Sequence, residues 1–223
     1  QDDCPICTLP LPIYNPMKMY ESCCGNYLCR GCCEEDFRVT EERGYKLRCA
    51  FCREPKPTSD NQLVKSYQKR MEMDDSIAIF VCSEWYTFGL YGTPKIPKKA
   101  FELCLRAAKL GNLEACVNVG MLYEDGVVVP KDMTKKWEYL EKAVKGGNIQ
   151  ARYNLGGIEH RKDNYRIACR HLLISAAAGD DNSLEMIDYY YKMKLVTKKE
   201  YATVLVSFRK VHKDEWSIER ERA

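Results

Sequence analysis

The chain has 223 residues, of which 45% are hydrophobic and 30% are charged, and its formal net charge is +3 with neutral histidines. This length accommodates one elongated domain or a small module followed by a larger one. No run approaches the ~18 apolar residues of a membrane-spanning helix, and the opening QDDCPIC lacks the basic and apolar parts of a secretory signal. We therefore expect an intracellular protein, either cytoplasmic or nuclear. Because the initiator methionine is missing, we also expect a segment preceding Gln1.

Cysteine is distributed unevenly along the chain. Nine of the thirteen cysteines lie between residues 4 and 52. The other four stand singly in apolar segments with a helical pattern, and they are Cys82, Cys104, Cys116 and Cys169. Free cysteine behaves as a small hydrophobic residue in such surroundings, so we expect these four in the core.

The N-terminal cysteines contain three Cys-x-x-Cys pairs, which are Cys4/Cys7, Cys29/Cys32 and Cys49/Cys52. Two intervening residues allow both sulfurs to reach one metal ion, with nearby backbone N–H groups donating to the sulfurs. Disulfides are the alternative, but without a secretory signal nothing supports an oxidising compartment. Three pairs this close together indicate zinc.

Two tetrahedral zinc sites need eight ligands, so the stretch YESCCGNYLCRGCCE must supply two beyond the pairs. The candidates are Cys23, Cys24 and Cys33, since the histidines lie far downstream. Cys33 follows Cys32 near the start of the expected helix CCEEDFRVTEERG, which favours a direction away from the ion that Cys32 faces. We therefore favour Cys23 and Cys24, with Cys33 as the alternative to Cys23.

Residues 4–53 resemble the RING finger of ubiquitin ligases, through the motifs CPIC, CCGNYLCRGC and CAFCR. The resemblance implies a small α+β fold with two zinc ions in a cross-brace. It assigns Cys4, Cys7, Cys29 and Cys32 to one zinc, and Cys23, Cys24, Cys49 and Cys52 to the other. The sequence departs from the family twice: Asn26 replaces a usual histidine ligand, and Ala50 replaces a proline that commonly touches the partner enzyme.

A RING finger performs no covalent catalysis and instead orients a ubiquitin-charged conjugating enzyme for attack by a lysine. The resemblance implies that Ile6, Phe51 and Arg53 contact this enzyme, with Arg53 donating to the conjugated ubiquitin. The alternative is that Ile6 and Phe51 merely cover their zinc knuckles and that Arg53 is an exposed cation.

Two all-cysteine zinc sites also change the charge balance. Each site of four thiolates and one Zn²⁺ contributes −2, which lowers the formal charge from +3 to −1. Acidic and basic residues are otherwise interspersed, and Glu34, Glu35 and Asp36 lie beside the cysteines, so nucleic-acid binding is disfavoured. The scattered histidines have no nucleophile motif beside them, which gives no support to a hydrolase.

The segment EPKPTSDNQLV, residues 54–64, is a predicted boundary between a zinc-binding domain at 1–57 and a helical domain at 58–223. In the second part, helix ends recur at Gly111, Gly147 and Gly179, and helix starts recur near Ala78, Ala115, Ala151 and Ser183. A period near 36 residues with two helices per unit predicts an all-α solenoid whose units must stack. Gly120 and Gly156 are expected where helices approach closely.

This part resembles Sel1-like repeats, which are relatives of tetratricopeptide repeats. The clearest unit contains ACVNVGMLYEDG and then PKDMTK; the next lacks a glycine-rich interhelix loop, and the last is weak. We expect three to four repeats and a charged C-terminal capping helix.

The combination predicts a RING-type E3 ubiquitin ligase with two Zn²⁺ ions. Its partners would be a ubiquitin-conjugating enzyme and a protein substrate bound by the repeats, with neither nucleic acid nor membrane involved. The alternative, which Ala50 supports, is a zinc-stabilised interaction scaffold without ligase activity.

Overall fold

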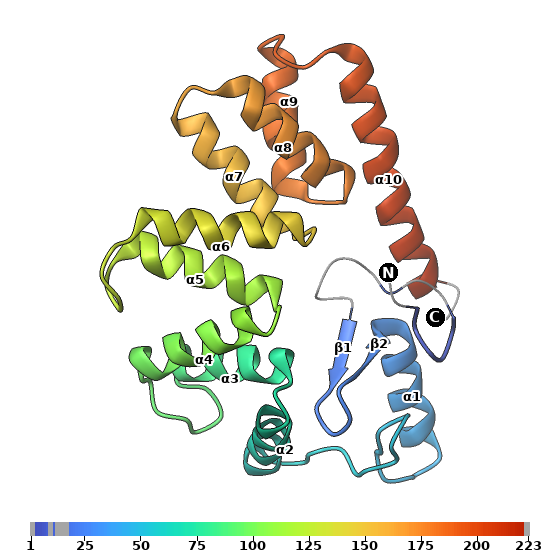
Figure 1. The fold of residues 1–223 in the computed structure, drawn as a ribbon. Helices are drawn as coiled ribbons and strands as arrows, with labels where there is room; N and C mark the ends of the chain where they lie inside the picture. The colour runs from blue at the N-terminus through green and yellow to red at the C-terminus, as the bar shows by residue number, and fades with distance from the viewer. Residues whose placement is uncertain (1–2, 9–10, 12–17, 221–223) are drawn as a thin grey trace. The chain divides into compact units, whose positions relative to one another are not determined.

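This computed structural model describes residues 3–8, 11 and 18–220, with side chains up to residue 212. The chain divides into two compact units, residues 1–136 and 137–221, so the predicted domain boundary at residue 57 stays a prediction. Helices dominate both units (Figure 1). Among the described helices, none combines the length and the hydrophobicity that crossing a membrane requires.

The first unit begins with a small antiparallel hairpin of β1 (Lys18–Glu21) and β2 (Asn26–Cys29), which leads into α1 (Arg30–Glu42). The register pairs Tyr20 with Tyr27, so these two rings share one face of the hairpin. Leu28 follows Tyr27 in β2, so it lies on the opposite face of the hairpin, and it is fully buried. The hairpin therefore has one aromatic face, whereas its opposite face is buried at Leu28 and exposed at Met19.

The remaining helices of the first unit are α2 (Asp60–Glu72), α3 (Ser76–Phe88), α4 (Pro97–Lys109), α5 (Leu113–Asp125) and the start of α6 (Met133–Lys145). The second unit contains the rest of α6, then α7 (Ile149–Arg161), α8 (Tyr165–Ala177), α9 (Asp181–Lys192) and α10 (Lys198–Arg220). Neighbouring helices pack in sequence, α3 on α4 and α4 on α5, then α7 on α8 and α8 on α9. This arrangement is the predicted helical solenoid.

The first helix of each repeat, and likewise α9 after the last repeat, begins at an acidic or amide side chain that caps it. The capping residues are Asp75 for α3, Asn112 for α5, Asn148 for α7 and Asp180 for α9. Each side chain accepts a hydrogen bond from the backbone N–H three residues further on, which satisfies a donor that the helix itself leaves unpaired. The caps are 37, 36 and 32 residues apart, which is the predicted repeat spacing.

The predicted glycine turns are present just before three of these caps. Gly111, Gly147 and Gly179 have φ angles of +95°, +90° and +99°, a region that residues with a Cβ rarely adopt. Gly156 has a packing role instead, because a Cβ there would lie 2.7 Å from Cγ of Leu172. The expectation of a close approach at Gly156 is confirmed, between α7 and α8.

The isolated cysteines lie in the core, as expected. The exposed fractions of Cys82, Cys104, Cys116 and Cys169 are between 0% and 5%. In the second unit, Cys169 belongs to a cluster with Leu172, Ile187, Tyr190 and Val204. Val204 belongs to α10, which packs against α8 and α9 as the predicted capping helix would.

Candidate metal centres

The first cysteine group joins two segments of the N-terminal region. Cys4 and Cys7 flank a turn, Cys29 ends β2 and Cys32 lies in the first turn of α1. Their four sulfurs all lie within 4.8 Å of one another, and those of Cys7 and Cys29 are 3.8 Å apart. The backbone N–H of Cys29 donates to the sulfur of Cys4, and that of Cys32 donates to the sulfur of Cys29. The N-terminal turn, the strand end and the helix start thus place four sulfurs around one point.

The second group joins the hairpin turn to a later loop. Cys23 and Cys24 lie in the turn between β1 and β2, and Cys49 and Cys52 come from the loop after α1. All four sulfurs again lie within 4.8 Å of one another, with 3.7 Å between Cys24 and Cys49 and 3.4 Å between Cys23 and Cys52.

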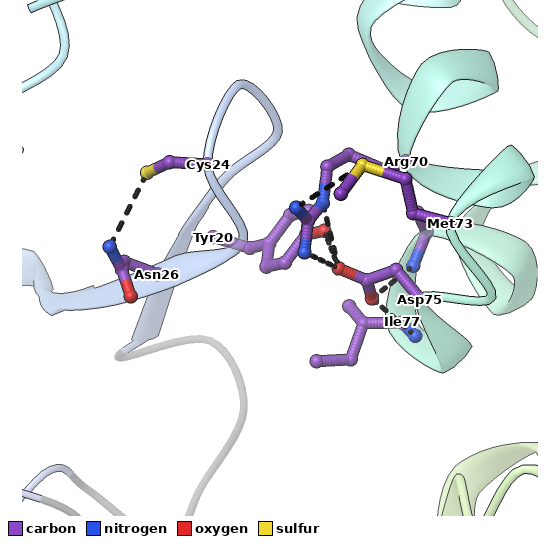
Figure 2. Close-up of polar contacts among 8 residues, drawn as sticks. Tyr20, Cys24, Asn26, Arg70, Met73, Asp75 and Ile77 are labelled. Carbon is purple, nitrogen blue, oxygen red and sulfur yellow. Dashed lines mark hydrogen bonds and ion pairs between the residues drawn. The ribbon is translucent and has the colours of Figure 1, made fainter. Parts of the chain in front are cut away.

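Asn26 does not take the place of a ligand in this group. Its side-chain amide donates to the sulfur of Cys24 across 3.5 Å (Figure 2). The backbone N–H of Phe51 donates to the sulfur of Cys49, so two sulfurs of this group accept hydrogen bonds from nitrogen donors. Such donors offset the negative charge of thiolates.

The sulfur separations fit a shared metal ion and do not fit disulfides. Four sulfurs at ~2.3 Å from a tetrahedral zinc are ~3.8 Å from one another, whereas a disulfide brings two sulfurs to ~2.05 Å. The separations of 3.4 to 3.8 Å lie close to the metal value. The donor sets, each four thiols with N–H groups around them, are suited to zinc and could hold two ions.

Backbone donors act on the thiol of Cys4. Burial opposes its ionisation, but hydrogen bonds from the backbone N–H groups of Cys29, Cys7 and Ile6 prevail and lower its pKa to about 6. In the same group, burial raises the pKa of Cys29, so the thiols of this group do not ionise alike in the absence of a metal.

Cys33 lies outside both groups. Its sulfur is 4.0 Å from the ammonium of Lys56, which also forms a 2.9 Å ion pair with Glu21. Burial raises the pKa of the Cys33 thiol, although the charge of Lys56 acts in the opposite direction. The structure thus brings Cys23, and not Cys33, beside Cys24, Cys49 and Cys52.

The three predicted partner-contact residues lie around the cysteine groups with different exposure. Ile6, between Cys4 and Cys7, has 50% of its surface exposed, Arg53 is exposed, and Phe51 is half-buried. Arg53 has a φ of +60° and its carbonyl accepts a hydrogen bond from Arg48. Arg53 is one of the residues that line a pocket of ≈ 380 Å³, together with Asp36, Thr40, Tyr45, Lys46 and Arg48. Their contact with a conjugating enzyme stays a prediction.

Sequence reasoning missed a polar network that connects the hairpin to the helices. The hydroxyl of Tyr20 in β1 donates to a carboxylate oxygen of Asp75 at 2.7 Å, and the guanidinium of Arg70 donates to the same oxygen (Figure 2). The other oxygen of Asp75 caps α3 at the N–H groups of Ile77 and Ala78. The position of Asp75 before a predicted helix indicates a capping role. Nothing in the sequence around Asp75 identifies Tyr20 as its second partner.

Three comparisons with known proteins bear on this architecture. Residues 76–112, 113–148 and 149–180 match the family model of the Sel1 repeat, and they are Sel1 repeats as the sequence predicted. The matched residues begin at the first residue of α3. The resemblance of the N-terminal region to RING fingers therefore rests on its cysteine pattern and geometry.

Among curated proteins, the chain is similar to chitin synthase regulatory factor 4 of Schizosaccharomyces pombe, with 28% identity over 134 residues. The match covers 59% of this chain and 21% of that protein, so the chain spans about a fifth of this relative's length.

Two solved structures show the same fold. A Sel1 repeat protein from Oxalobacter formigenes has a TM-score of 0.60 and 16% identity, with 79% of this chain and 70% of that chain covered. A protective antigen of uropathogenic Escherichia coli, described as displaying an SLR fold, has a TM-score of 0.56 and 20% identity, with 82% and 37% covered. Both likenesses concern the fold, and they agree with an α-solenoid of Sel1 repeats.

Proposed function

We propose that this protein is an interaction scaffold that binds protein partners through its Sel1 repeats and carries a zinc-stabilised module at its N-terminus. The observation that carries the proposal is the array of three Sel1 repeats, since stacked helix pairs offer an extended surface for other proteins. The name of the fission yeast relative, a regulatory factor, also favours a regulatory protein.

The eight grouped cysteines would hold two zinc ions, with four thiolates to each ion. A zinc with four protein ligands has no open coordination position, so its contribution is structural, on the order of 10 kcal/mol of folding free energy. The bound ions would hold together the segments that carry the grouped cysteines, which are the N-terminal turn, the hairpin turn, the start of α1 and the loop after it. The zinc ions would therefore replace a large hydrophobic core in this small region.

A second candidate function is that of a RING-type E3 ubiquitin ligase. The observation that favours it is the interleaving of the two cysteine groups along the chain, since the first and third pairs converge at one point and the second and fourth at another. This is the cross-brace order of RING fingers. The exposed side chains of Ile6 and Arg53 are available to a ubiquitin-conjugating enzyme.

The scaffold proposal is tested by cross-linking mass spectrometry of the tagged full chain in cells. We expect partner cross-links to concentrate on lysines of the repeats, within residues 76–180. If the cross-links to other proteins fall outside these residues, the proposal is wrong.

The ligase candidate needs a separate assay on protein shown by native mass spectrometry to hold two zinc ions. Discharge of ubiquitin from a panel of charged conjugating enzymes onto free lysine is compared for the native chain and Ile6→Ala. Acceleration that Ile6→Ala removes would establish the ligase. If the chain accelerates ubiquitin discharge from none of the conjugating enzymes, the ligase candidate is wrong and the scaffold has no transfer activity.

A further inference from the structure

We propose that Tyr20, Arg70 and Asp75 hold the cysteine-rich module rigidly on the first repeat, so that its exposed surface keeps one direction relative to helices α3–α5. By cysteine-rich module we mean the described residues between Cys4 and Lys56, which are 4–8, 11 and 18–56. The proposal deepens the scaffold function and rests on the module binding zinc as proposed. It assigns these three residues a positioning role.

Asp75 is the centre of this contact. One carboxylate oxygen accepts from Tyr20 of the hairpin and from Arg70 of α2, while the other caps α3. The side chain of Asp75 is 9% exposed and that of Arg70 is 19% exposed, so water competes little for these bonds. A single buried carboxylate thus joins three elements, and its bond from Tyr20 is the one that restricts the direction of the hairpin.

Aromatic rings extend this contact from the module into the repeat. The ring of Tyr20 lies 5.4 Å from that of Tyr27 and 5.7 Å from that of Tyr67 in α2. Tyr67 in turn lies 4.9 Å from Trp85 of α3, edge to face. Ser22 of the hairpin turn also hydrogen-bonds Ser66 at 2.8 Å. Because several contacts of different kind act on one hairpin, rotation of the module would break them together.

The second cysteine group is connected directly to this surface. Gly25 follows Cys24 in the hairpin turn and has a φ of +80°. A Cβ at this position would lie 2.1 Å from a guanidinium nitrogen of Arg70, so the turn rests against that side chain. Cys23 and Cys24 belong to the same turn, and a metal bound there would fix the backbone that Arg70 contacts.

A fixed module has a consequence for the partners of the scaffold. A partner bound to a module on a flexible linker could occupy many positions relative to the repeats. A partner bound to a rigidly held module is confined to a small range of positions. A partner bound by the module would therefore reach only part of a second partner bound on helices α3–α5. The three residues would set which pairs of partners can meet.

The test is ¹⁵N relaxation NMR on the zinc-loaded full chain, with zinc content checked by native mass spectrometry on the same sample. In the native chain we expect amides of β1, β2 and α1 to share the rotational correlation time of amides in α3–α5. In the double variant Tyr20→Phe/Asp75→Asn the correlation time of the module should fall about twofold, because the module then reorients as a smaller body. Tyr27→Phe removes a neighbouring hydroxyl outside this contact and should change nothing.

A native module that reorients separately from α3–α5 would overturn the proposal, and so would a double variant that still shares their correlation time. Arg70→Gln is the second variant, and it leaves the cap on α3 in place. If the double variant disturbs α3, Arg70→Gln must by itself lower the correlation time of the module for the proposal to stand. A chain without zinc refutes the metal assignment, whereas a zinc-loaded chain with a separately reorienting module refutes the positioning role.

Discussion

The hydroxyl of Tyr20 donates a hydrogen bond to the carboxylate of Asp75, a residue 55 positions further along the chain, across 2.7 Å. The same aspartate caps α3, the first helix of the repeat array. One side chain therefore takes part both in the start of the repeats and in their contact with the cysteine-rich region. Because of this double use, we expect Asp75 to contribute more to stability than the other caps of the array.

The first prediction concerns the substitution Asp75→Ala. It removes the cap of α3 and leaves Tyr20 and Arg70 without their acceptor, so we expect a loss of about 2–4 kcal/mol in the free energy of unfolding. Asp180→Ala is the matched control, because Asp180 caps α9 in the second unit and should cost about 1 kcal/mol. Amide hydrogen exchange of α3 and of α9 measures the two losses separately. Equal losses would show that the contact with Tyr20 and Arg70 adds nothing.

The second prediction concerns alkaline pH. Burial, with the hydrogen bond to Asp75 next in size, raises the pKa of Tyr20 well above its usual value of about 10. The folded state thus retains a proton that the unfolded state loses, so this contribution is complete below about pH 10 and declines as the pH rises from there toward the folded-state pKa.

Urea unfolding followed by tryptophan fluorescence between pH 8 and pH 11 checks this prediction, on the native chain and on Tyr20→Phe. The native chain should lose more stability above about pH 10 than the variant does, since the phenylalanine has no proton to lose. Parallel pH profiles of the two proteins would contradict the assigned cause.

The repeats could be predicted from the sequence because their determinants are local and periodic. Gly111, Gly147 and Gly179 mark helix ends, and the alanines at the third position of the first helices recur at a similar interval. The three Cys-x-x-Cys pairs could be recognised because their spacing is a property of the chain segment itself, whereas the division of eight cysteines into two groups came from the resemblance to RING fingers.

The contact between Tyr20 and Asp75 has no such local determinant. A tyrosine in a strand and an aspartate before a helix have many possible partners, and the choice depends on how the hairpin lies on α2 and α3. The same holds for Gly25, whose need for a small residue arises both from its φ angle and from the position of Arg70. From the sequence alone, residues 54–64 therefore resembled a linker. In the structure, hydrogen bonds connect the hairpin before this segment to α2 and α3 after it.

The third prediction separates Cys24 from Cys33. Cys24→Ser removes a member of the second group, so we expect the zinc content to fall from two ions per chain to one. Cys33→Ser is the matched control, because Cys33 lies outside both groups beside Lys56, and two ions should remain. Native mass spectrometry measures both contents. Two ions in Cys24→Ser, or one ion in Cys33→Ser, would refute the assignment of the second site.

The fourth prediction compares two adjacent glycines of α7. In Gly156→Ala the new Cβ would lie 2.7 Å from Cγ of Leu172, a fully buried residue of the second unit. The helices must separate or Leu172 must leave its rotamer, so we expect a loss of about 1–3 kcal/mol.

Gly157→Ala is the control for the packing at Gly156. The nearest atom to its Cβ is a guanidinium nitrogen of Arg161 at 3.8 Å, which is an ordinary contact. Alanine is the better helix former by about 1 kcal/mol, so this variant should be more stable than the native chain. Hydrogen exchange of α7 and α8 measures both effects. Because the two glycines lie in the same helix turn, opposite signs would assign the loss at Gly156 to its contact with Leu172, whereas two gains would show that α7 and α8 can separate at little cost.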